Sequence, residues 1–247
     1  MKKLLAMVLA LAMAVSMVAC GNAEKTVDIH AKSEGVMTYE EYAAAALDSE
    51  VVIEAFVQAK QSWWEDKATV YAQDKDGAYF LYNMACSEED YAKLTKGTKI
   101  KVKGYKAEWS GEVEIMDATI TILEGSYIAT EALDVTALMG TDALAEKMNM
   151  KVAVKGMTVE ASKDKDGNDV PFLYKWDGSG SQGDDIYFNV SVNGNTYTFT
   201  VNAYMIGNEA TYKAVEALKI GDKIDVEGFL YWYNGAQPHV TAVAPAK

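Results

Sequence analysis

The sequence predicts an all-β protein with short helices, in which two tandem five-stranded Greek-key barrels follow a leader segment. One observation is a series of short alternating apolar stretches, separated by turns rich in Gly, Asn and Asp. Another is an internal repeat: residues 94–105 (LTKGTKIKVKGY) align with 218–229 (LKIGDKIDVEGF), with Leu, Gly, Ile, Val, Gly and an aromatic at the same offsets. A repeat of about a hundred residues indicates two homologous domains, because solenoid repeats are shorter.

The first copy is expected to form five strands and two short helices. Thr38 and Glu41 are spaced as a capping box, which opens the first helix. Asp74–Gly77 is a hairpin turn signal between the second and third strands. Ser87 can cap a second helix, which ends at Leu94. The expected strands span 51–59, 68–73, 78–86, 99–107 and 113–123.

The second copy repeats this order. Thr141 can cap a short helix, and Asn208 can cap the helix between the third and fourth strands. Asn193-Gly194 is a turn signal between the second and third strands. A long insertion at 162–185 separates the first two strands and has no counterpart in the first copy. The expected strands span 150–161, 186–192, 196–204, 223–233 and 239–243.

Three strands, a helix and two further strands is the element order of the OB-fold, a five-stranded Greek-key barrel. Over 38–125 and 141–245 the chain resembles small periplasmic and surface bacterial OB-fold proteins, on this order and on the shared Leu-x-x-Gly and Gly-aromatic positions. The resemblance implies a binding scaffold and fixes no ligand. Other five-stranded barrels are the structural alternative. The expected domains are 37–125 and 141–247, joined by a linker at 126–140.

The first twenty residues are typical of an extracytoplasmic lipoprotein that is anchored to a bacterial membrane. Lys2 and Lys3 precede an apolar run, 4–14, that is too short for an ordinary transmembrane helix. Met17–Cys20 resembles a bacterial lipobox, in which a signal peptidase cuts before the cysteine after its thiol is diacylated. A plain secretory signal with a chance cysteine is the alternative. The expected segments are a signal peptide at 1–19, a lipid on Cys20 and a flexible tether over 20–36.

Charge and cysteine content limit the partners. The formal net charge is −13, which disfavours a polyanion. All 23 basic residues are Lys, so the sequence has no Arg, the side chain best suited to bidentate phosphate contacts. We therefore expect nucleic acid to be disfavoured as a partner.

With Cys20 lipidated, Cys86 is the only other cysteine, so no internal disulfide can form. No cofactor is expected.

Aromatic residues are concentrated where an OB-fold binds its ligand. That region is the face of strands two and three, framed by the loops that join strands one to two and four to five. A Trp in a polar loop exposes a large apolar area unless it packs or binds something. We expect a stacking rim at one mouth of each barrel. The candidate ligand-binding residues are Trp63, Trp64 and Trp109 for the first barrel, and Trp176, Tyr231, Trp232 and Tyr233 for the second.

These features favour a non-catalytic binding module whose ligand is a glycan or a peptide, such as a glycan or protein of the cell envelope. One alternative is a structural or adaptor module that contacts another envelope protein. Another is a single-stranded nucleic-acid binder, because OB-folds also bind oligonucleotides. A structural alternative for the Trp residues is that they cap the open barrel ends or fill the seam between the domains.

Catalytic and metal chemistry have few candidate residues. His30 and His239 are the only histidines, and no zinc spacing, nucleophile elbow or phosphate loop occurs in the sequence. Asp164–Asp169 begins like a calcium loop but lacks Gly at the sixth position and Glu at the twelfth. Cys86 ends an apolar strand and is expected to be buried and inert. We expect no catalytic residue and no metal site.

Lys99, Lys101 and Lys103 lie on one face of an expected strand and form what we call the lysine stripe. Such a stripe can follow a phosphate backbone. Glu112 and Glu114 lie on the next strand, which is expected to pair with it. We expect these carboxylates to neutralise the stripe across the ladder.

Overall fold

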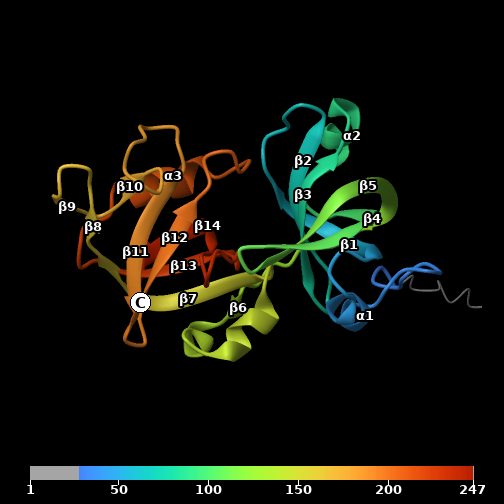
Figure 1. Cartoon of the computed structure of the whole chain (residues 1–247), viewed down its shortest axis with the longest axis horizontal. Coiled ribbons are helices and arrows are strands. Elements are labelled where there is room, and N and C mark those ends of the chain that lie inside the picture. The colour runs from blue at the N-terminus through green and yellow to red at the C-terminus, as the bar shows by residue number, and fades with distance from the viewer. Residues whose placement is uncertain (1–27, 247) are drawn as a thin grey trace, which may run out of the picture.

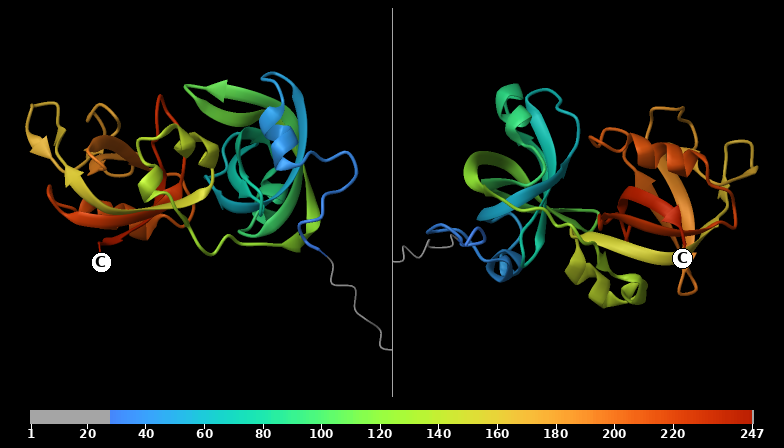
Figure 2. Two further views of the ribbon diagram at one scale, coloured as in Figure 1. Left: turned by 90° about the horizontal axis from the view of Figure 1, so that it is seen from below. Right: turned by 180° about the vertical axis from the view of Figure 1, so that it is seen from behind.

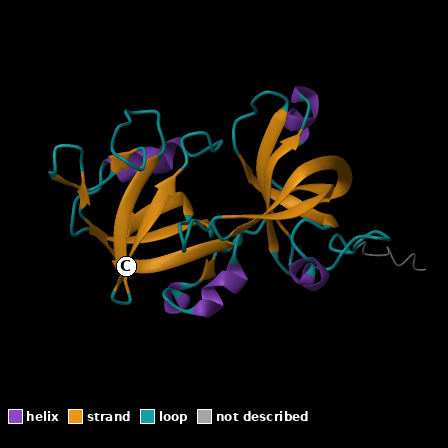
Figure 3. Cartoon of the chain, viewed as in Figure 1, coloured by secondary structure: helices purple, strands orange, loops and turns teal. Residues whose placement is uncertain are grey.

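The computed structural model describes residues 28–246, which form two β-barrel lobes side by side (Figure 1). The expected signal peptide and Cys20 lie outside the described residues. Strands form the centre of each lobe and helices lie at the periphery (Figure 3). The lobes are also distinct when the molecule is seen from below and from behind (Figure 2).

The first lobe is a closed five-stranded barrel with the strand order β1-β2-β3-β5-β4 around the ring. β3 and β5 pair in parallel, and the other neighbours are antiparallel. The expected capping box is present, because the Thr38 hydroxyl accepts from the Glu41 amide and the Glu41 carboxylate accepts from the Thr38 amide. The elements are α1 (Tyr39–Ala44), β1 (Glu50–Lys60), β2 (Lys67–Gln73), β3 (Ala78–Ala85), α2 (Glu88–Lys93), β4 (Thr98–Trp109) and β5 (Glu112–Ser126).

The second lobe has the same topology. Its five main strands run β7-β11-β12-β14-β13, and a pairing between β11 and β7 closes the ring. These strands and their helix are β7 (Lys151–Glu160), β11 (Ile186–Val192), β12 (Asn195–Val201), α3 (Glu209–Glu216), β13 (Lys223–Phe229) and β14 (His239–Pro245). The insertion contains the short strands β8 (Ser162–Lys163), β9 (Asp169–Val170) and β10 (Leu173–Tyr174). Both lobes are OB-folds, and the predicted fold class is confirmed.

Buried and outward-facing side chains alternate along the strands, and the buried set fills each barrel. In β11, for example, Ile186, Phe188 and Val190 are buried in the second core, whereas Tyr187 and Asn189 point outward. The first barrel has its own separate core, built in the same way. A side-chain period of two therefore places one set of residues inside each barrel and leaves the other set for the outer face.

Part of the expected tether is docked on the first barrel. The Lys99 ammonium donates to the Ala31 carbonyl at 3.0 Å. The His30 ring packs edge-on against Phe56, with the ring centroids 5.3 Å apart. The expectation of a flexible tether is therefore wrong for 28–36, because side chains of β1 and β4 have partners in this segment.

Part of the expected linker, 126–140, belongs to the second domain. β6 (Leu133–Asp134) pairs in parallel with β7, and Val135 and Met139 are buried in the second core. Only the stretch 127–132 connects the last strand of the first barrel to β6. Two 3-10 helices follow β6, at η1 (Thr136–Leu138) and η2 (Asp142–Lys147).

The expected neutralisation of the lysine stripe by Glu112 and Glu114 is wrong. The register of β4 and β5 places Glu112 opposite Trp109, several residues beyond the stripe. Lys99 is paired with Glu54 of β1 instead, at 3.3 Å. Both Glu112 and Glu114 are buried.

The two barrels meet through four aromatic rings, which we call the seam cluster: Tyr71 and Phe80 of the first barrel, Phe229 and Tyr231 of the second. The Tyr71 and Phe229 rings stack, with their centroids 4.4 Å apart and their planes at 11°. Phe80 meets Tyr231 edge-on at 5.4 Å. Each ring buries on the order of 150–250 Å², so the seam contributes hydrophobic stabilisation of the kind found in a core.

Hydrogen bonds also join the domains. The tip of the β4–β5 hairpin reaches the loop between β13 and β14 (Figure 1). There the Asn234 amide donates to the Ser110 carbonyl at 2.7 Å, and the Trp232 amide donates to Oε2 of Glu112 at 2.8 Å. We call this contact between 109–112 and 231–235 the hairpin clasp.

Gly104 and Gly228 occupy equivalent positions in the fourth strands. They lie opposite Val51 and Val152, the second residue of the first strand in each barrel. Each also lies at a register shift against the fifth strand. A Cβ added to Gly228 would lie 2.4 Å from the carbonyl oxygen of His239, which leaves no room for a side chain.

Gly228→Ala is expected to lower the free energy of unfolding by about 1–3 kcal/mol, because the β14 backbone must shift to admit a methyl group. Thr196→Ala, at an exposed position of β12, is the control and should change stability by no more than about 0.5 kcal/mol. Urea unfolding followed by circular dichroism measures both variants. Equal stabilities for the two variants would contradict the steric argument.

Candidate ligand-binding cleft

The outer face of β2 and β3, which an OB-fold commonly uses for ligands, is covered in the first barrel. Its outward residues Tyr71 and Phe80 belong to the seam cluster and are almost fully buried. This face packs against the second domain. The first barrel therefore has no free ligand face of the usual kind.

The equivalent face of the second barrel is open. The outward residues of its second and third strands line a cleft of about 750 Å³: Tyr187 and Asn189 on β11, Thr198 and Thr200 on β12. The duplicated fold thus uses the same face in two ways, for domain docking in one barrel and for a cleft in the other.

Loops from both domains frame the cleft. Leu173 and Trp176 come from the 162–185 insertion, and Tyr233 comes from the loop between β13 and β14. The first domain contributes Trp109, whose ring centroid lies 5.2 Å from that of Tyr233. The side chains of Trp109 and Trp176 are 54% and 76% exposed, so both indoles present large apolar faces to solvent at the cleft.

Four of the seven expected ligand-binding residues line this cleft, namely Trp109, Trp176, Tyr231 and Tyr233. The other three do not line it. Trp63 is half-buried, and its indole N–H donates to the Cys86 carbonyl at 2.9 Å. Trp64 is 71% exposed in the turn before β2, and Trp232 packs against the second core.

The expected rim on each barrel is therefore replaced by one composite rim. Trp109 lies beside Tyr233 of the second domain rather than with Trp63 and Trp64. Sequence reasoning missed Phe80, Tyr82, Tyr187 and the polar residues of β11 and β12. Alternation along β11 and β12 could have identified their cleft residues, because it shows which side chains of these strands point away from the core. Nothing in the sequence signalled those of β3, because they reach the cleft only through the docking of the domains.

The bottom of the cleft is polar and mostly neutral. Asn189 accepts a hydrogen bond from Thr198 at 2.8 Å. Burial raises the pKa of Asp185, whose carboxylate accepts from the Ala203 amide at 2.7 Å. Lys163 is the one basic residue in the lining, and it pairs with Asp169 at 2.8 Å. Amides and hydroxyls can bind hydroxyl or amide groups of a ligand without a charge partner.

His239 links the cleft to the seam. Its ring stacks on Tyr231 with centroids 4.2 Å apart, and its Nδ1 is hydrogen-bonded to the Tyr71 hydroxyl at 2.5 Å. Burial lowers the pKa of His239 to about 3, so the imidazole is neutral at physiological pH. It therefore serves as a packed hydrogen-bonding group beneath the cleft.

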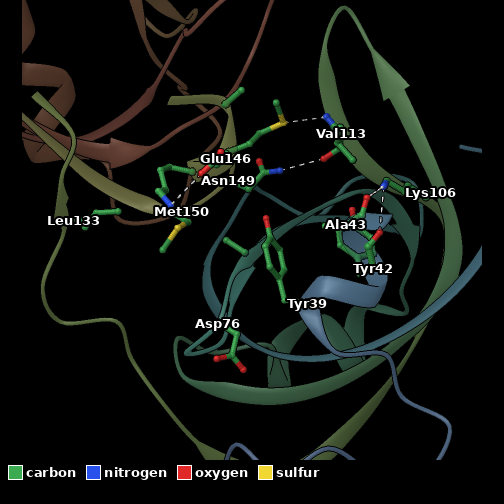
Figure 4. A pocket seen from close by; sticks show the side chains of 14 residues that line it. Tyr39, Tyr42, Ala43, Asp76, Lys106, Val113, Leu133, Glu146, Asn149 and Met150 are labelled. Carbon is green, nitrogen blue, oxygen red and sulfur yellow. Dashed lines mark hydrogen bonds and ion pairs between the residues drawn. The ribbon is translucent and has the colours of Figure 1, made fainter. Parts of the chain in front are cut away.

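A second cavity, of about 500 Å³, lies along the seam between α1 and residues 145–150 (Figure 4). Tyr39 and Tyr42 form one wall, and Asn149 lies opposite. The Lys106 ammonium in this wall donates to three carbonyls at the end of α1, at 2.8–3.1 Å, so it is already engaged. This cavity lacks exposed indoles, and the composite cleft is the better candidate site.

Other chemistry has little support among residues 28–246. This part of the chain has no cluster of three His, Cys, Asp or Glu side chains arranged to hold a metal. It also has no helix with the length and apolarity needed to cross a membrane. Burial raises the pKa of the Cys86 thiol, which disfavours the reactive thiolate.

No protein-family model and no curated protein matches the chain. Among solved structures, it is similar to a tetrameric p202 HIN2, at 11% identity over 82% of this chain and 96% of that chain, with a TM-score of 0.33. It is also similar to a murine DNA-binding protein bound to double-stranded DNA, at 13% identity over 81% and 99%, with a TM-score of 0.34. A deletion mutant of the single-stranded DNA-binding protein from Thermus aquaticus gives 14% identity over 80% and 94%, with a TM-score of 0.27.

These structures correct one expectation. The charge of the chain predicted that nucleic acid is disfavoured as a partner, whereas several of the similar structures are complexes with double-stranded DNA. That expectation is withdrawn. The TM-scores are 0.34 or lower, so the similarity does not select a ligand for this chain, and the choice rests on the chemistry of the cleft.

Acid should destabilise the fold through His239. The unfolded chain takes up a proton on this residue near pH 6.5, whereas the folded chain does so only near pH 3. Stability is therefore lost as the pH falls through this window. His239→Gln retains an acceptor for Tyr71 but does not titrate, so its unfolding free energy should fall less between pH 6.5 and 4. Urea unfolding at a series of pH values compares the two proteins, and parallel curves would refute the assignment.

Proposed function

We propose that this chain is a non-catalytic binding module that holds its ligand in the composite cleft. The observation that carries the proposal is the position of Trp109 and Trp176, two exposed indoles from different domains at one cleft on the open OB face. Large exposed aromatic rings around a polar cleft mark a binding surface.

A saccharide fits the chemistry of this cleft. Sugar rings can pack on the faces of Trp109 and Trp176, and their hydroxyls can bond to the neutral side chains of Asn189 and Thr198. No charge partner is needed for such a ligand. A glycan chain of the cell envelope is accordingly our first candidate.

Single-stranded nucleic acid is the second candidate. It is favoured by the location of the cleft on the second and third strands, framed by the two loops with which OB-folds bind oligonucleotides. Unpaired bases stack on aromatic side chains without sequence preference. Salt dependence separates the two candidates, because only a phosphate chain releases counterions on binding.

The affinity of the cleft is expected to depend on its indoles. Trp109→Ala and Trp176→Ala should each weaken binding of a neutral oligosaccharide or an oligothymidylate by about 5- to 150-fold, the equivalent of about 1–3 kcal/mol per stacked ring. Trp64→Ala, which removes an equally exposed indole outside the cleft, is the control. Trp fluorescence titrations at low and high salt measure the constants. Equal weakening by Trp64→Ala, or no fluorescence change with either probe class, would refute the proposal.

We further propose that the module is held on the outside of a bacterial membrane by a lipid on Cys20. The support is the sequence alone, in which a basic start, an apolar run and a lipobox occur together. A diacylated thiol carries two chains, which suffices for stable anchoring.

Cys20→Ala should release the protein from the membrane fraction into the medium, because the thiol that accepts the lipid is lost. Cys86→Ala is the matched control and should stay with the membrane, since the Cys86 thiol is buried in the first barrel. Immunoblots of membrane and medium fractions measure the distribution. Membrane retention of the Cys20 variant would contradict lipid anchoring.

A further inference from the structure

Glu112 is in the hairpin clasp, three residues after Trp109. Its side chain is 0% exposed. Through Oε2 it accepts from the Trp232 amide at 2.8 Å, and this is the side-chain bond by which the β4–β5 hairpin holds the loop that carries Tyr233. The residue thus connects the two aromatic side chains that form one wall of the cleft.

Within residues 28–246, no basic side chain neutralises Glu112. Lys106 of β4 lines the seam cavity, but it donates its ammonium to the carbonyls of Tyr42, Ala43 and Ala45. An ionised Glu112 would be a buried charge without a counter-ion, which is strongly unfavourable. The titratable groups that face Glu112 are the carboxyl of Glu114 on β5 and the phenols of Tyr42 on α1, Tyr71 on β2 and Tyr231 after β13.

Two buried side-chain oxygens in this region have no hydrogen-bond partner among the described residues. Oε1 of Glu112 receives no hydrogen bond from any described residue, and neither does Oδ1 of Asn149. The Asn149 side chain lies within hydrogen-bonding reach of the Glu112 carboxyl. Its amide nitrogen donates one hydrogen to the Val113 carbonyl at 3.1 Å (Figure 4), and its second hydrogen is left for the Glu112 carboxyl, whose pKa this contact lowers. Burial acts in the opposite direction, and a proton on Oε1 of Glu112 would remove the charge from an oxygen that has no donor.

We propose that Glu112 is a positioning residue for the cleft: as a neutral carboxylic acid it accepts from the Trp232 amide without placing a charge in the seam, and so holds the hairpin clasp. Loss of the proton leaves a buried charge without a counter-ion in the seam. The clasp then loosens, and Trp109 no longer stays beside Tyr233. The inference rests on the proposed function only for the use of the cleft, since the clasp is formed by the protein's own residues.

The electrostatics agree with this geometry. Burial raises the pKa of Glu112 to about 8 and that of Glu114 to about 7. A carboxyl whose folded-state pKa exceeds its unfolded value of about 4.5 stabilises the fold at low pH. That stabilisation is lost as the pH rises from about 4.5 through 8, so alkaline solution should open the clasp.

The protonation state can be measured directly in the full chain. In protein labelled with ¹³C at the glutamate side-chain carboxyl, one Glu resonance should titrate near pH 8 in the native protein. It should persist in Glu114→Gln and disappear in Glu112→Gln. If every Glu resonance titrates below pH 6 in the native protein and in Glu114→Gln, the proposal is overturned, even if Glu112→Gln does not fold.

The positioning role needs a second readout. The fluorescence of Trp109, taken as the difference between the native protein and Trp109→Phe, should change with a midpoint near pH 8. Glu112→Gln is neutral and offers an oxygen to the Trp232 amide, so its Trp109 signal should match the native signal at pH 6 and stay constant to pH 9. A purely structural Glu112 would give no pH transition in either protein. An unchanged transition in Glu112→Gln would also overturn the proposal. Neither readout requires a ligand, so a failed ligand screen leaves this test intact.

Discussion

The stack of Tyr71 on Phe229 determines which surface of the molecule is free to bind. The outer face of β2 and β3 is the face on which an OB-fold commonly binds its ligand. In the first barrel this face is buried against the second domain, so it serves for domain docking. The same packing brings Phe80 and Trp109 to the edge of the second barrel's open face. The cleft is therefore a property of the domain pair, and neither barrel could form it alone.

The two copies share a topology but differ in what they place on the outer face. β2 and β3 present Tyr71 and Phe80, which are large rings that gain free energy when they leave water. β11 and β12 present Asn189 and Thr198, which gain little from burial unless each polar group finds a partner. Divergence at a few outward positions thus gave one barrel a docking face and the other a ligand face. The insertion that carries Trp176 extends the second face further.

The sequence predicted the barrels because their signals are local. Alternation, the capping box at Thr38 and the repeated glycines at 104 and 228 each depend on neighbours along the chain or in one sheet. The sequence did not predict the composite cleft, because Trp109 and Tyr233 meet only through the clasp between domains. It also misplaced Glu112. A carboxylate directly after a turn is usually solvated, and only the tertiary packing shows that this one is buried.

Directional bonds complement the apolar packing of the seam. Hydrophobic burial is roughly proportional to area and has no preferred direction, so the seam cluster alone would allow the barrels to rotate against each other. Hydrogen bonds between the domains oppose that rotation, among them three that involve side chains: Gln73 accepts from the Lys151 amide at 2.9 Å, Tyr71 bonds to His239 at 2.5 Å, and Glu112 accepts from Trp232 at 2.8 Å. A buried polar group that loses its partner is costly, which gives such bonds their specificity. Since the cleft has walls from both domains, the bonds that fix the interdomain angle also fix the width of the site.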